Sequence, residues 1–461
     1  MISLPPELHP ILEQLNAHHI TPIVVGGYVR DALLNLHSKD IDIELYNLPS
    51  LEELEQILKP FGKLNLVGKS FGVIKLRIKE LEIDFSPPRT ESKHTAGHKG
   101  FEMSFDCVLD FQTASRRRDF TINAIGYNPL TKTLLDPYGG CDDLRDKRLM
   151  CVDEKTFIED PLRPLRAIQF AARFDLTCDP VLLALCKEMI SSGALEELPK
   201  ERIFEEFKKL FLLSPKPSIG MELLRKMGAL PFFSPLDLFE HTPQDRLSHP
   251  EGNVWIHTLM TLDVMATLRT GNPKHDLTRM FVMLLHDCAK PITTIITNGE
   301  INAPKHAKAG VEVAKIFLEK ITNEHALKED VLPLIRYHGK VRKLYENNAS
   351  IPDILHLSTR VSIEELILVS KADFLGRAFS SGRPTCFTAG EWLYSQAKEL
   401  GVLRSPPKPL IMGRDLIALG LTPSKAFKLI LENSYKAQLN QQFFTEDGAL
   451  KWLKKHLVTA L

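Results

Sequence analysis

Two glycines and an arginine, residue types that often bind phosphate, lie close together near the start of the chain. An apolar strand predicted at 23–25 runs into Gly26 and Gly27, and glycines let backbone N–H groups approach phosphate oxygens. A helix is expected to begin near residue 29, where its positive end favours an anion and Arg30 adds a charged fork. The segment predicts a phosphate cradle, although a glycine pair by itself is also typical of a plain strand-to-helix turn.

Alternating carboxylates follow the glycines. From residue 40 to residue 45, acidic and apolar side chains alternate, which places Asp40, Asp42 and Glu44 on one face of a predicted strand. Two neighbouring acids can share a hard cation such as Mg²⁺, and proteins commonly bind nucleoside triphosphates as complexes with this ion. A solvated strand face is the alternative for this pattern alone, but the glycine turn just before it favours a nucleotide and metal site.

Two later segments add charge suited to nucleotides. Arg116–Arg118 are consecutive cations that repel one another unless an anion or several carboxylates neutralise them, so they suggest polyphosphate or RNA, with a basic surface patch as the alternative. Asp160 precedes Pro161 and could cap a helix. Alternatively, Asp160 and Arg163 lie three apart on one helical face and offer an acceptor and a donor fork to the edge of cytosine or adenine.

Together these segments resemble the signature of the nucleotidyltransferase superfamily. Within it they are similar to the bacterial branch that contains tRNA CCA-adding enzymes and poly(A) polymerases. The resemblance rests on motifs that follow one another in the expected order at 24–31 with 39–43, at 116–124, at 136–140 and at 159–167.

The resemblance implies a role for each matching residue. Asp40 and Asp42 would be the catalytic Mg²⁺ ligands, and Asp84, on a predicted strand at 81–85, would be a third catalytic carboxylate unless it is simply a surface acid. Arg118 and Arg166 would contact phosphates, and Asp119 and Asn123 the ribose. The implied nucleotide-binding set is Gly26, Gly27, Arg30, Arg118, Asp119, Asn123, Asp160, Arg163 and Arg166.

One position departs from the family pattern. Gln169 stands where related enzymes tend to carry an arginine, three residues after Arg166. The change removes a positive charge. It leaves open how firmly phosphate is held and which activity of the family is kept.

Histidines and aspartates spread over residues 249–373 resemble an HD-type phosphohydrolase. A lone buried histidine is usually a core residue, but imidazoles and carboxylates together suit a divalent transition metal. The resemblance implies phosphomonoesterase or 2′,3′-cyclic phosphodiesterase activity on RNA ends. The expected metal ligands are His257, His286, Asp287 and Asp373, with His306, His338 and Lys290 as contacts to a second metal or to phosphate.

The pattern of elements predicts an α+β protein with four parts. An α/β nucleotidyltransferase head at 1–150 precedes an all-helical neck at 151–240, an HD domain at 245–375 and a helical tail at 384–461 that could contact tRNA. The expected strands are 23–25, 41–45, 72–78 and 81–85. The expected neck helices include 181–190, 203–213 and 221–227, and residues 89–100 are expected to form a mobile loop.

The overall composition restricts the kind of protein this can be, but it does not identify the function. The chain has 58 Lys and Arg and 58 Asp and Glu, so RNA would be held by local patches such as the tail from Arg404, with nine basic against four acidic residues. A solvated helical face is the alternative for that tail. The seven cysteines include no Cys-x-x-Cys pair, and no long apolar run occurs. We therefore expect a cytoplasmic protein without a membrane partner.

The sequence predicts a Mg²⁺-dependent enzyme that adds CCA to tRNA 3′ ends from CTP and ATP, with an HD unit that hydrolyses phosphate at RNA ends. A poly(A) polymerase or a CC- or A-adding enzyme shares the head motifs and stays open. An alternative of another class is an HD phosphohydrolase with a nucleotide-sensing head, and a third is a non-catalytic RNA-binding module.

Overall fold

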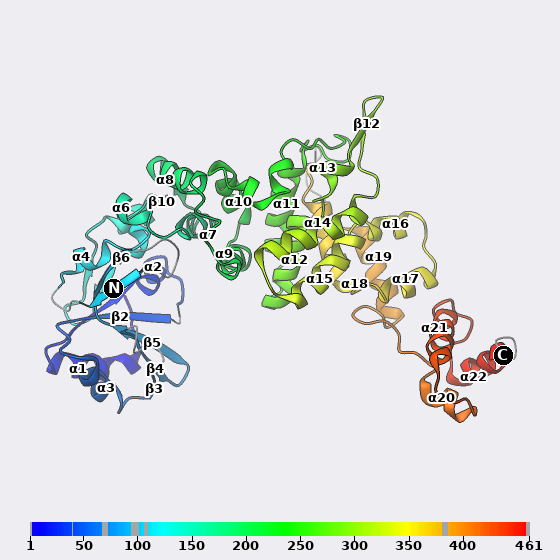
Figure 1. Ribbon diagram of the computed structural model, residues 1–461, viewed down its shortest axis with the longest axis horizontal. Coiled ribbons are helices and arrows are strands. Elements are labelled where there is room, and N and C mark those ends of the chain that lie inside the picture. The colour runs from blue at the N-terminus through cyan, green and yellow to red at the C-terminus, as the bar shows by residue number, and fades with distance from the viewer. Residues whose placement is uncertain are drawn as a thin grey trace. The chain divides into compact units, whose positions relative to one another are not determined.

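The computed structural model describes residues 2–38, 40–66, 72–93, 101–105, 109–379 and 386–457. The chain divides into two compact units, residues 1–233 and residues 234–461 (Figure 1). The first unit contains a mixed sheet with helices, and the second is built mainly from helices, so the predicted α+β class is confirmed.

A seven-stranded sheet forms the head of the first unit, with strand order β3-β4-β5-β2-β1-β8-β9. The central strands β2 and β5 are parallel, whereas the other neighbouring pairs are antiparallel. The bounds are β1 Thr21–Val25, β2 Asp40–Tyr46, β3 Lys63–Asn65, β4 Ile74–Ile78, β5 Leu81–Ser86, β8 Gly126–Asn128 and β9 Thr133–Leu135.

Apolar residues on the buried face hold this sheet in place. Ile41, Ile43, Ile83 and Phe85 are at most 1% exposed, so β2 and β5 each turn their alternate, polar residues the other way. The head helices are α1 His9–Ala17, α2 Gly27–Leu33, α3 Leu51–Leu58, α4 Phe111–Ser115 and α5 Gly140–Arg145.

The predicted strands of the head are all present, and the structure adds others. The prediction of a loop over residues 89–100 was wrong for its first part, because β6 (Arg89–Lys93) pairs antiparallel with β7 (Phe101–Phe105). Residues 94–100 lie outside the described residues. The charged composition of this segment gave no strand signal, and its partner is a later segment, so local patterning could not reveal the pairing.

The rest of the first unit is helical. The helices α6 (Glu154–Phe157), α7 (Arg163–Phe174), α8 (Pro180–Ser191), α9 (Lys200–Leu213) and α10 (Pro217–Lys226) follow the head, which confirms the predicted neck helices. Helix α7 packs against both α9 and α10. A short parallel pair, β10 (Arg148–Leu149) with β11 (Thr177–Cys178), adds strand structure where the predicted head meets the predicted neck.

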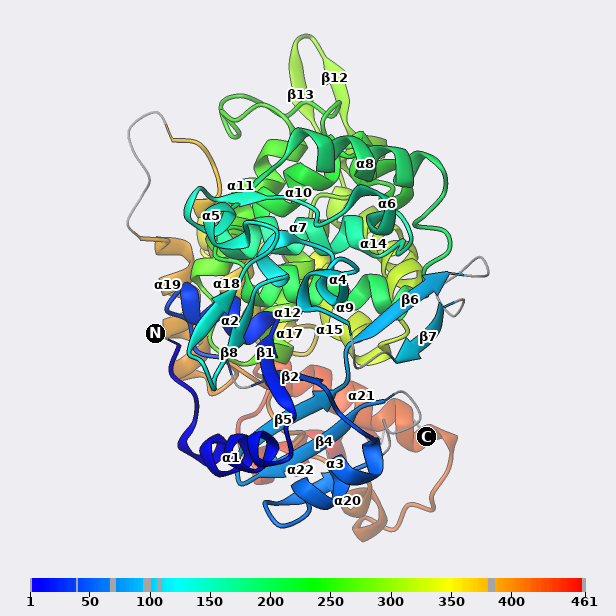
Figure 2. The same cartoon turned by 90° about the vertical axis from the view of Figure 1, so that its left-hand side faces the viewer.

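The second unit is a helical bundle followed by a smaller helical cluster. A short hairpin of β12 (Ile295–Thr297) and β13 (Glu300–Asn302) projects from the bundle (Figures 1 and 2). The bundle helices are α11 Val254–Thr267, α12 Pro273–Leu285, α13 Lys290–Thr293, α14 His306–Ile321, α15 His325–Tyr337, α16 Lys340–Glu346, α17 Ile351–Ser358, α18 Ile363–Leu375 and α19 Thr388–Glu399.

The end of the chain has a core of its own. Helices α20 (Gly413–Ala418), α21 (Lys425–Leu439) and α22 (Glu446–Leu457) enclose an apolar cluster, whereas α19 packs on α16 and α18 of the bundle. The predicted tail boundary at Pro384 lies outside the described residues. Within the described ranges, no helix has both the length and the apolar character that crossing a membrane requires.

Candidate active sites

The carboxylates of the head meet across two parallel strands. Asp42 on β2 lies in register with Asp84 on β5, and Asp40 lies in register with Glu82. Parallel neighbours are about 4.8 Å apart, so Asp42 and Asp84 stand side by side on the polar face of the sheet. Asp40 and Asp42 are exposed, and Asp84 is half-buried. The structure therefore brings the three predicted catalytic acids together.

The glycine turn lies against the same acids. Strand β1 ends at Val25, which is paired with Asp42, and Gly26 then adopts φ +70° before α2 begins at Gly27. A Cβ at Gly26 would lie 3.1 Å from Nη1 of Arg118 and 4.0 Å from Oδ2 of Asp42. The positive φ and the nearby guanidinium both favour glycine at this position, and the backbone turn lies against an arginine and a carboxylate.

Asp84 has a cationic partner that the sequence analysis missed. Lys75 on β4 is in register with Asp84, and its Nζ lies 2.6 Å from Oδ2 of that carboxylate. The lysine is about half exposed, so the ion pair is open to solvent and to exchange. Only the register of two strands reveals it.

The Asp42 carboxylate has a raised pKa. The surrounding protein displaces part of its solvent and raises its pKa, Asp84 and Asp40 add to this effect, and Arg118 opposes it. Close carboxylates that repel one another bind a divalent cation well, because the cation neutralises both charges. The three acids therefore fit the Mg²⁺ that the sequence predicts.

Glu44 differs from the two acids that precede it on β2. It is only 2% exposed, and its Oε1 lies 2.7 Å from Nη2 of Arg118 while its Oε2 accepts from the Tyr46 hydroxyl at 3.0 Å. Burial by itself would raise the pKa of Glu44, but Arg118 and Arg117 lower it overall. Glu44 thus holds Arg118 beside Gly26.

Carboxylates neutralise the consecutive arginines. Arg116 pairs with Asp153 at 2.8 Å, and Arg118 pairs with Glu44 and donates from Nη1 to the Asn123 carbonyl oxygen at 3.3 Å. Their mutual repulsion is therefore relieved within the protein. Arg118 is the predicted phosphate contact that lies nearest to the glycine turn and the acids.

Four of the predicted nucleotide contacts form an internal network. Asp119 Oδ2 accepts from Nε and Nη2 of Arg166, both at 2.6 Å, and its Oδ1 accepts from Nδ2 of Asn123 at 2.9 Å. Asn123 Oδ1 in turn accepts from Nη1 of Arg30. Burial would raise the pKa of Asp119, but Arg166 and the other partners lower it. A ribose or phosphate would have to exchange one of these partners.

Arg30 joins the head to helix α7. Its guanidinium is 4% exposed, bonds Oδ1 of Asp31 at 2.6 Å and 2.9 Å, and lies over the rings of Phe170 and Phe174. Nη2 of Arg30 also lies 3.5 Å from the position of a Cβ on Gly27. The predicted phosphate contact for Arg30 remains a prediction, and its present partners give it a structural role.

The base-reading prediction needs a correction in its geometry. Helix α7 begins at Arg163, so Asp160 precedes the helix and the two residues do not share one helical face. Oδ1 of Asp160 accepts from the backbone N–H of Leu162 at 3.0 Å, within the turn before the helix. The N-cap residue is Leu162, which makes no side-chain cap, so Asp160 does not cap α7 either. The guanidinium of Arg163 donates to the carbonyl oxygens of Thr156 at 2.7 Å and Arg117 at 2.6 Å. The chain starts the helix later because Pro164 occupies its second position.

Gln169 lies on α7, one turn beyond Arg166. It is 2% exposed, and its Oε1 has no hydrogen-bond partner within the described part of the chain. An uncharged amide at this buried position avoids burying another cation beside the Arg166–Asp119 pair.

The second unit gathers its predicted ligands from five helices. Asp287 follows α12, and its two oxygens face different imidazoles. Oδ2 lies 3.2 Å from Nε2 of His286 and 4.0 Å from Nε2 of His257, whereas Oδ1 lies 3.5 Å from Nε2 of His306 and 4.0 Å from Nε2 of His338. Asp373 on α18 lies 3.2 Å from His257 Nε2. All six predicted residues therefore converge on one centre.

Backbone carbonyls orient three of the imidazoles. Nδ1 of His286, His306 and His338 lies 2.8 to 2.9 Å from the carbonyl oxygen three residues earlier in each case. With Nδ1 as the donor, each Nε2 keeps its lone pair for a metal. Nε2 of His286 is buried and has no well-aligned hydrogen bond within the described residues, although Oδ2 of Asp287 lies 3.2 Å away, and such an arrangement suits an atom that binds a metal.

The burial of these side chains and the charges around them set protonation states that suit a bound cation. Burial, together with the nearby His286 and His306, lowers the pKa of His338 to about 4, so the ring is neutral at pH 7. Burial would raise the pKa of Asp287, but Lys290 at 2.7 Å and the imidazoles hold it well below its ordinary value. Neutral imidazoles with ionised carboxylates are the donor set of a divalent transition metal. Three groups could each hold an ion: His257 with His286 and Asp373, Asp287 with His306 and His338, and His249 with Glu251 and His257.

Glu251 is a residue of this centre that the sequence analysis missed. Its Oε1 lies 2.8 Å from Nδ1 of His257 and 2.9 Å from Nδ1 of His249, and its Oε2 accepts from the Ala378 backbone N–H at 3.1 Å. The carboxylate thereby fixes the His257 ring with Nε2 towards Asp373. The acid lies in a turn before α11, where no periodic pattern marks it.

The fold and the two centres define a nucleotidyltransferase of the poly(A) polymerase class with an attached HD domain. Residues 23–150 match the poly(A) polymerase head domain, residues 175–236 match a probable RNA- and SrmB-binding site of polymerase A, and residues 254–378 match the HD domain. The chain is 31% identical to the multifunctional CCA protein of Nitrosococcus oceani, over 92% of this chain and 99% of that protein. It belongs to the family of multifunctional CCA proteins.

A second relative and a solved structure agree. The multifunctional CCA protein of Aliivibrio salmonicida is 33% identical, over 77% of this chain and 85% of that protein. The fold is similar to that of the Bacillus stearothermophilus CCA-adding enzyme in complex with CTP, with a TM-score of 0.67, 19% identity, and 99% of each chain covered.

Proposed function

We propose that the protein adds CCA to the 3′ ends of tRNA from CTP and ATP, in the cytoplasm, and that its HD domain hydrolyses phosphate at RNA ends. The observation that carries the first activity is the meeting of Asp42, Asp84, Gly26 and Arg118 in one corner of the head. The multifunctional CCA proteins in its family support the substrate assignment.

The head residues divide the work of nucleotidyl transfer. The 3′-oxygen of RNA attacks the α-phosphorus of the nucleotide, a new phosphodiester bond forms, and pyrophosphate leaves. Mg²⁺ held by Asp40, Asp42 and Asp84 would lower the pKa of the attacking hydroxyl and neutralise charge on the phosphates. Arg118, fixed by Glu44, lies beside Gly26 and would hold the polyphosphate in line.

The remaining predicted contacts stay part of the proposal. The pair of Asp160 and Arg163 is proposed to read the base edge from the start of α7 rather than from one helical face. Asp119 and Asn123 are proposed to meet the ribose, and Arg166 the phosphates. Each would exchange a protein partner for the nucleotide, which couples binding to a change in the network between head and neck.

The HD centre carries the second activity. A divalent transition metal held by His257, His286, Asp287 and Asp373 would polarise a phosphate oxygen and activate water. His306 and His338 are proposed to hold a second metal or the phosphate itself. Lys290 keeps Asp287 ionised and in place, through an ion pair of 2.7 Å.

The test of the transfer activity uses tRNA that lacks its terminal CCA, with labelled CTP or ATP. Incorporation of C, C and A in order is expected. Tailing with ATP alone on unrelated RNA would instead identify a poly(A) polymerase, and addition that stops after C or requires pre-existing CC would identify a partial enzyme. Phosphate release without any incorporation would favour an HD phosphohydrolase with a sensing head.

A further inference from the structure

A basic groove is lined by residues of helices α14 and α15. It is a cavity of about 420 Å³ whose charged lining consists of Lys308 on α14, Arg336 on α15 and Arg360 after α17. All three cations are exposed, and no acidic residue lines the groove. None of them forms an ion pair within the described ranges of the chain. Three cations that face one cavity repel one another unless an anion lies between them.

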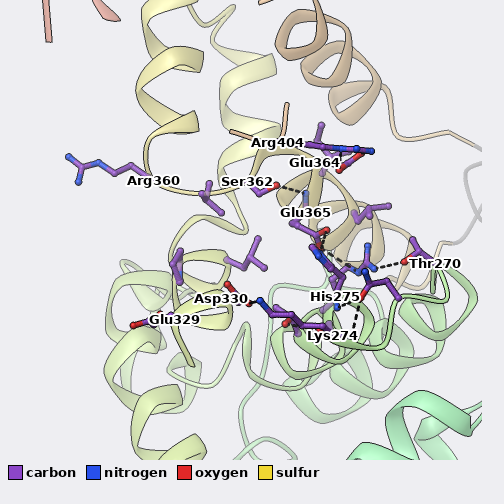
Figure 3. A pocket seen from close by; sticks show the side chains of 18 of the residues that line it. Thr270, Lys274, His275, Glu329, Asp330, Arg360, Ser362, Glu364, Glu365 and Arg404 are labelled. Carbon is purple, nitrogen blue, oxygen red and sulfur yellow. Dashed lines mark hydrogen bonds and ion pairs between the residues drawn. The ribbon is translucent and has the colours of Figure 1, made fainter. Parts of the chain in front are cut away.

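The neighbouring cavity shows what a neutralised lining looks like. It measures about 800 Å³ and shares Arg360 and Pro333 with the groove. Lys274 in its lining is paired with Asp330 at 2.9 Å, and Arg404 is paired with Glu364 at 2.8 Å (Figure 3). In the same view Arg360 stands apart from these pairs, with its side chain directed away from them (Figure 3). The cations of the groove, by contrast, have no ion-pair partner within the described residues and could bind an anionic ligand.

The groove begins beside the metal centre. Helix α14 starts at His306, two residues before Lys308, and α15 ends at Tyr337, next to His338. The Nε2 atoms of these two histidines lie 3.3 Å apart. A three-residue connection joins the helices, which pack against each other, so the start of α14 and the end of α15 are at the same end of the pair.

Two local features point to phosphate rather than to another anion. Lys308 lies in the first turn of a 16-residue helix, where the helix dipole disfavours a cation and favours an anion. Tyr337 lines the groove among the cations, with the Arg336 guanidinium 6.0 Å from its ring centroid, and an aromatic side chain beside arginines can stack a base. Cations that follow a backbone, with one stacking ring, are typical of single-stranded RNA binding.

We propose that this basic groove binds the sugar-phosphate backbone of a single-stranded RNA end and directs its terminal phosphate to the HD centre. The proposal rests on the hydrolase activity proposed above. It concerns the RNA chain next to the terminal phosphate, which the metal centre itself does not contact. Lys308, Arg336 and Arg360 neutralise successive phosphates, and Tyr337 stacks one base.

The test compares two substrates of the full-length protein. One is a short oligoribonucleotide that ends in a 2′,3′-cyclic phosphate, and the other is the cyclic mononucleotide of the same nucleoside. Arg336→Ala and Arg360→Ala are each expected to raise KM for the oligonucleotide about fivefold to tenfold with kcat unchanged, because each arginine binds the RNA chain and not the reacting group. The slope of log(1/KM) against log[salt] should become shallower by about 0.7 for each phosphate that the variant no longer neutralises.

Lys274→Ala is the matched control, because that lysine already has a partner in the neighbouring cavity. It should leave both substrates unaffected. The proposal that the groove binds RNA would be overturned by an equal rise in KM for the oligonucleotide in Lys274→Ala, or by an unchanged KM in both arginine variants. A rise in KM of the same size for the mononucleotide would also overturn it, since the residues would then act on the centre itself.

A second readout separates the groove from the hydrolase. An oligoribonucleotide with 4-thiouridine near its 3′ end should crosslink under light to the peptide that contains Tyr337, and Lys308→Ala with Arg360→Ala should remove that crosslink. If the protein hydrolyses neither substrate but the crosslink forms and is absent from the double variant, the groove stands and the hydrolase proposal fails. If hydrolysis occurs while the crosslink maps elsewhere, the hydrolase stands and the groove is wrong.

Discussion

The head site and the HD centre of this protein are built in opposite ways. The acids of the head lie on two neighbouring strands, with Asp40 and Asp42 exposed and Asp84 held by a surface lysine. In the HD centre, His257, His286 and Asp287 are at most 2% exposed, and backbone carbonyls or Glu251 already orient the imidazoles. An open site suits a cation that arrives with each nucleotide. A buried, oriented site suits a metal that stays.

The largest effect that tests this contrast is expected in the head. Asp42→Asn should lower the rate of CTP incorporation by about a thousandfold, because it removes a charge from the pair of acids proposed to hold Mg²⁺. Hydrolysis at the HD centre should keep its rate, which serves as the control for folding. Transfer that survives Asp42→Asn at a rate near that of the unaltered protein would show that the two strands do not form the active site.

The matching substitution in the second unit is His286→Ala. It should reduce phosphate hydrolysis by about a hundredfold or more and lower the transition metal retained after dialysis, because it removes an oriented ligand from a buried centre. Metal content by mass spectrometry and hydrolysis rates check both effects. His241→Ala, at an exposed histidine of the same unit, is the control. Full metal retention in His286→Ala would contradict the proposed centre.

A smaller effect concerns how the head holds Arg118. Glu44→Gln should lower the free energy of unfolding at pH 7 by about 2 kcal/mol, because it leaves the arginines without their buried carboxylate. The pKa of Glu44 in the folded protein lies below its ordinary value of 4.5, so the folded state binds fewer protons and the stabilisation is present above that value.

The ion pair of Glu44 with Arg118 also predicts how the free energy of unfolding changes with pH. Stability from Glu44 should be lost as the pH falls below about 4.5 and through the lowered pKa of the folded state. Urea unfolding at a series of pH values, with and without Glu44→Gln, measures it. The two stability curves should converge at low pH, and curves that stay parallel would show that Glu44 is not ionised beside Arg118.

The smallest effect tests how open the head site is. Lys75→Met should lower the Mg²⁺ concentration needed for half-maximal transfer by about twofold to fivefold, because Asp84 loses a partly exposed partner that competes with the metal. Lys79→Met, which removes a more exposed lysine paired with Glu7, is the control and should have no effect. A higher Mg²⁺ requirement in Lys75→Met would mean that the lysine supports the nucleotide instead.

Sequence reasoning succeeded where the chemistry is local. The alternation of acids on β2, the glycine turn into α2 and the helix that ends at His286 are each contained in a short segment, so side-chain periodicity predicts them. It went wrong for β6, whose partner strand comes later in the chain, and for Asp160, because the first turn of α7 starts after it. The boundaries of elements depend on contacts that a local pattern does not contain.

The sequence by itself determined which residue types stand at which spacing, and hence which residues are candidates for the chemistry, because type and spacing of two or of three to four are properties of the chain alone. Only the tertiary structure decided what those residues touch. It placed Asp84 between Asp42 and Lys75, turned Arg166 and Arg30 inward to Asp119, Asn123 and Asp31, and put Glu251 behind His257. These contacts join residues far apart in the chain, and the packing of strands and helices, not the local pattern, selects them.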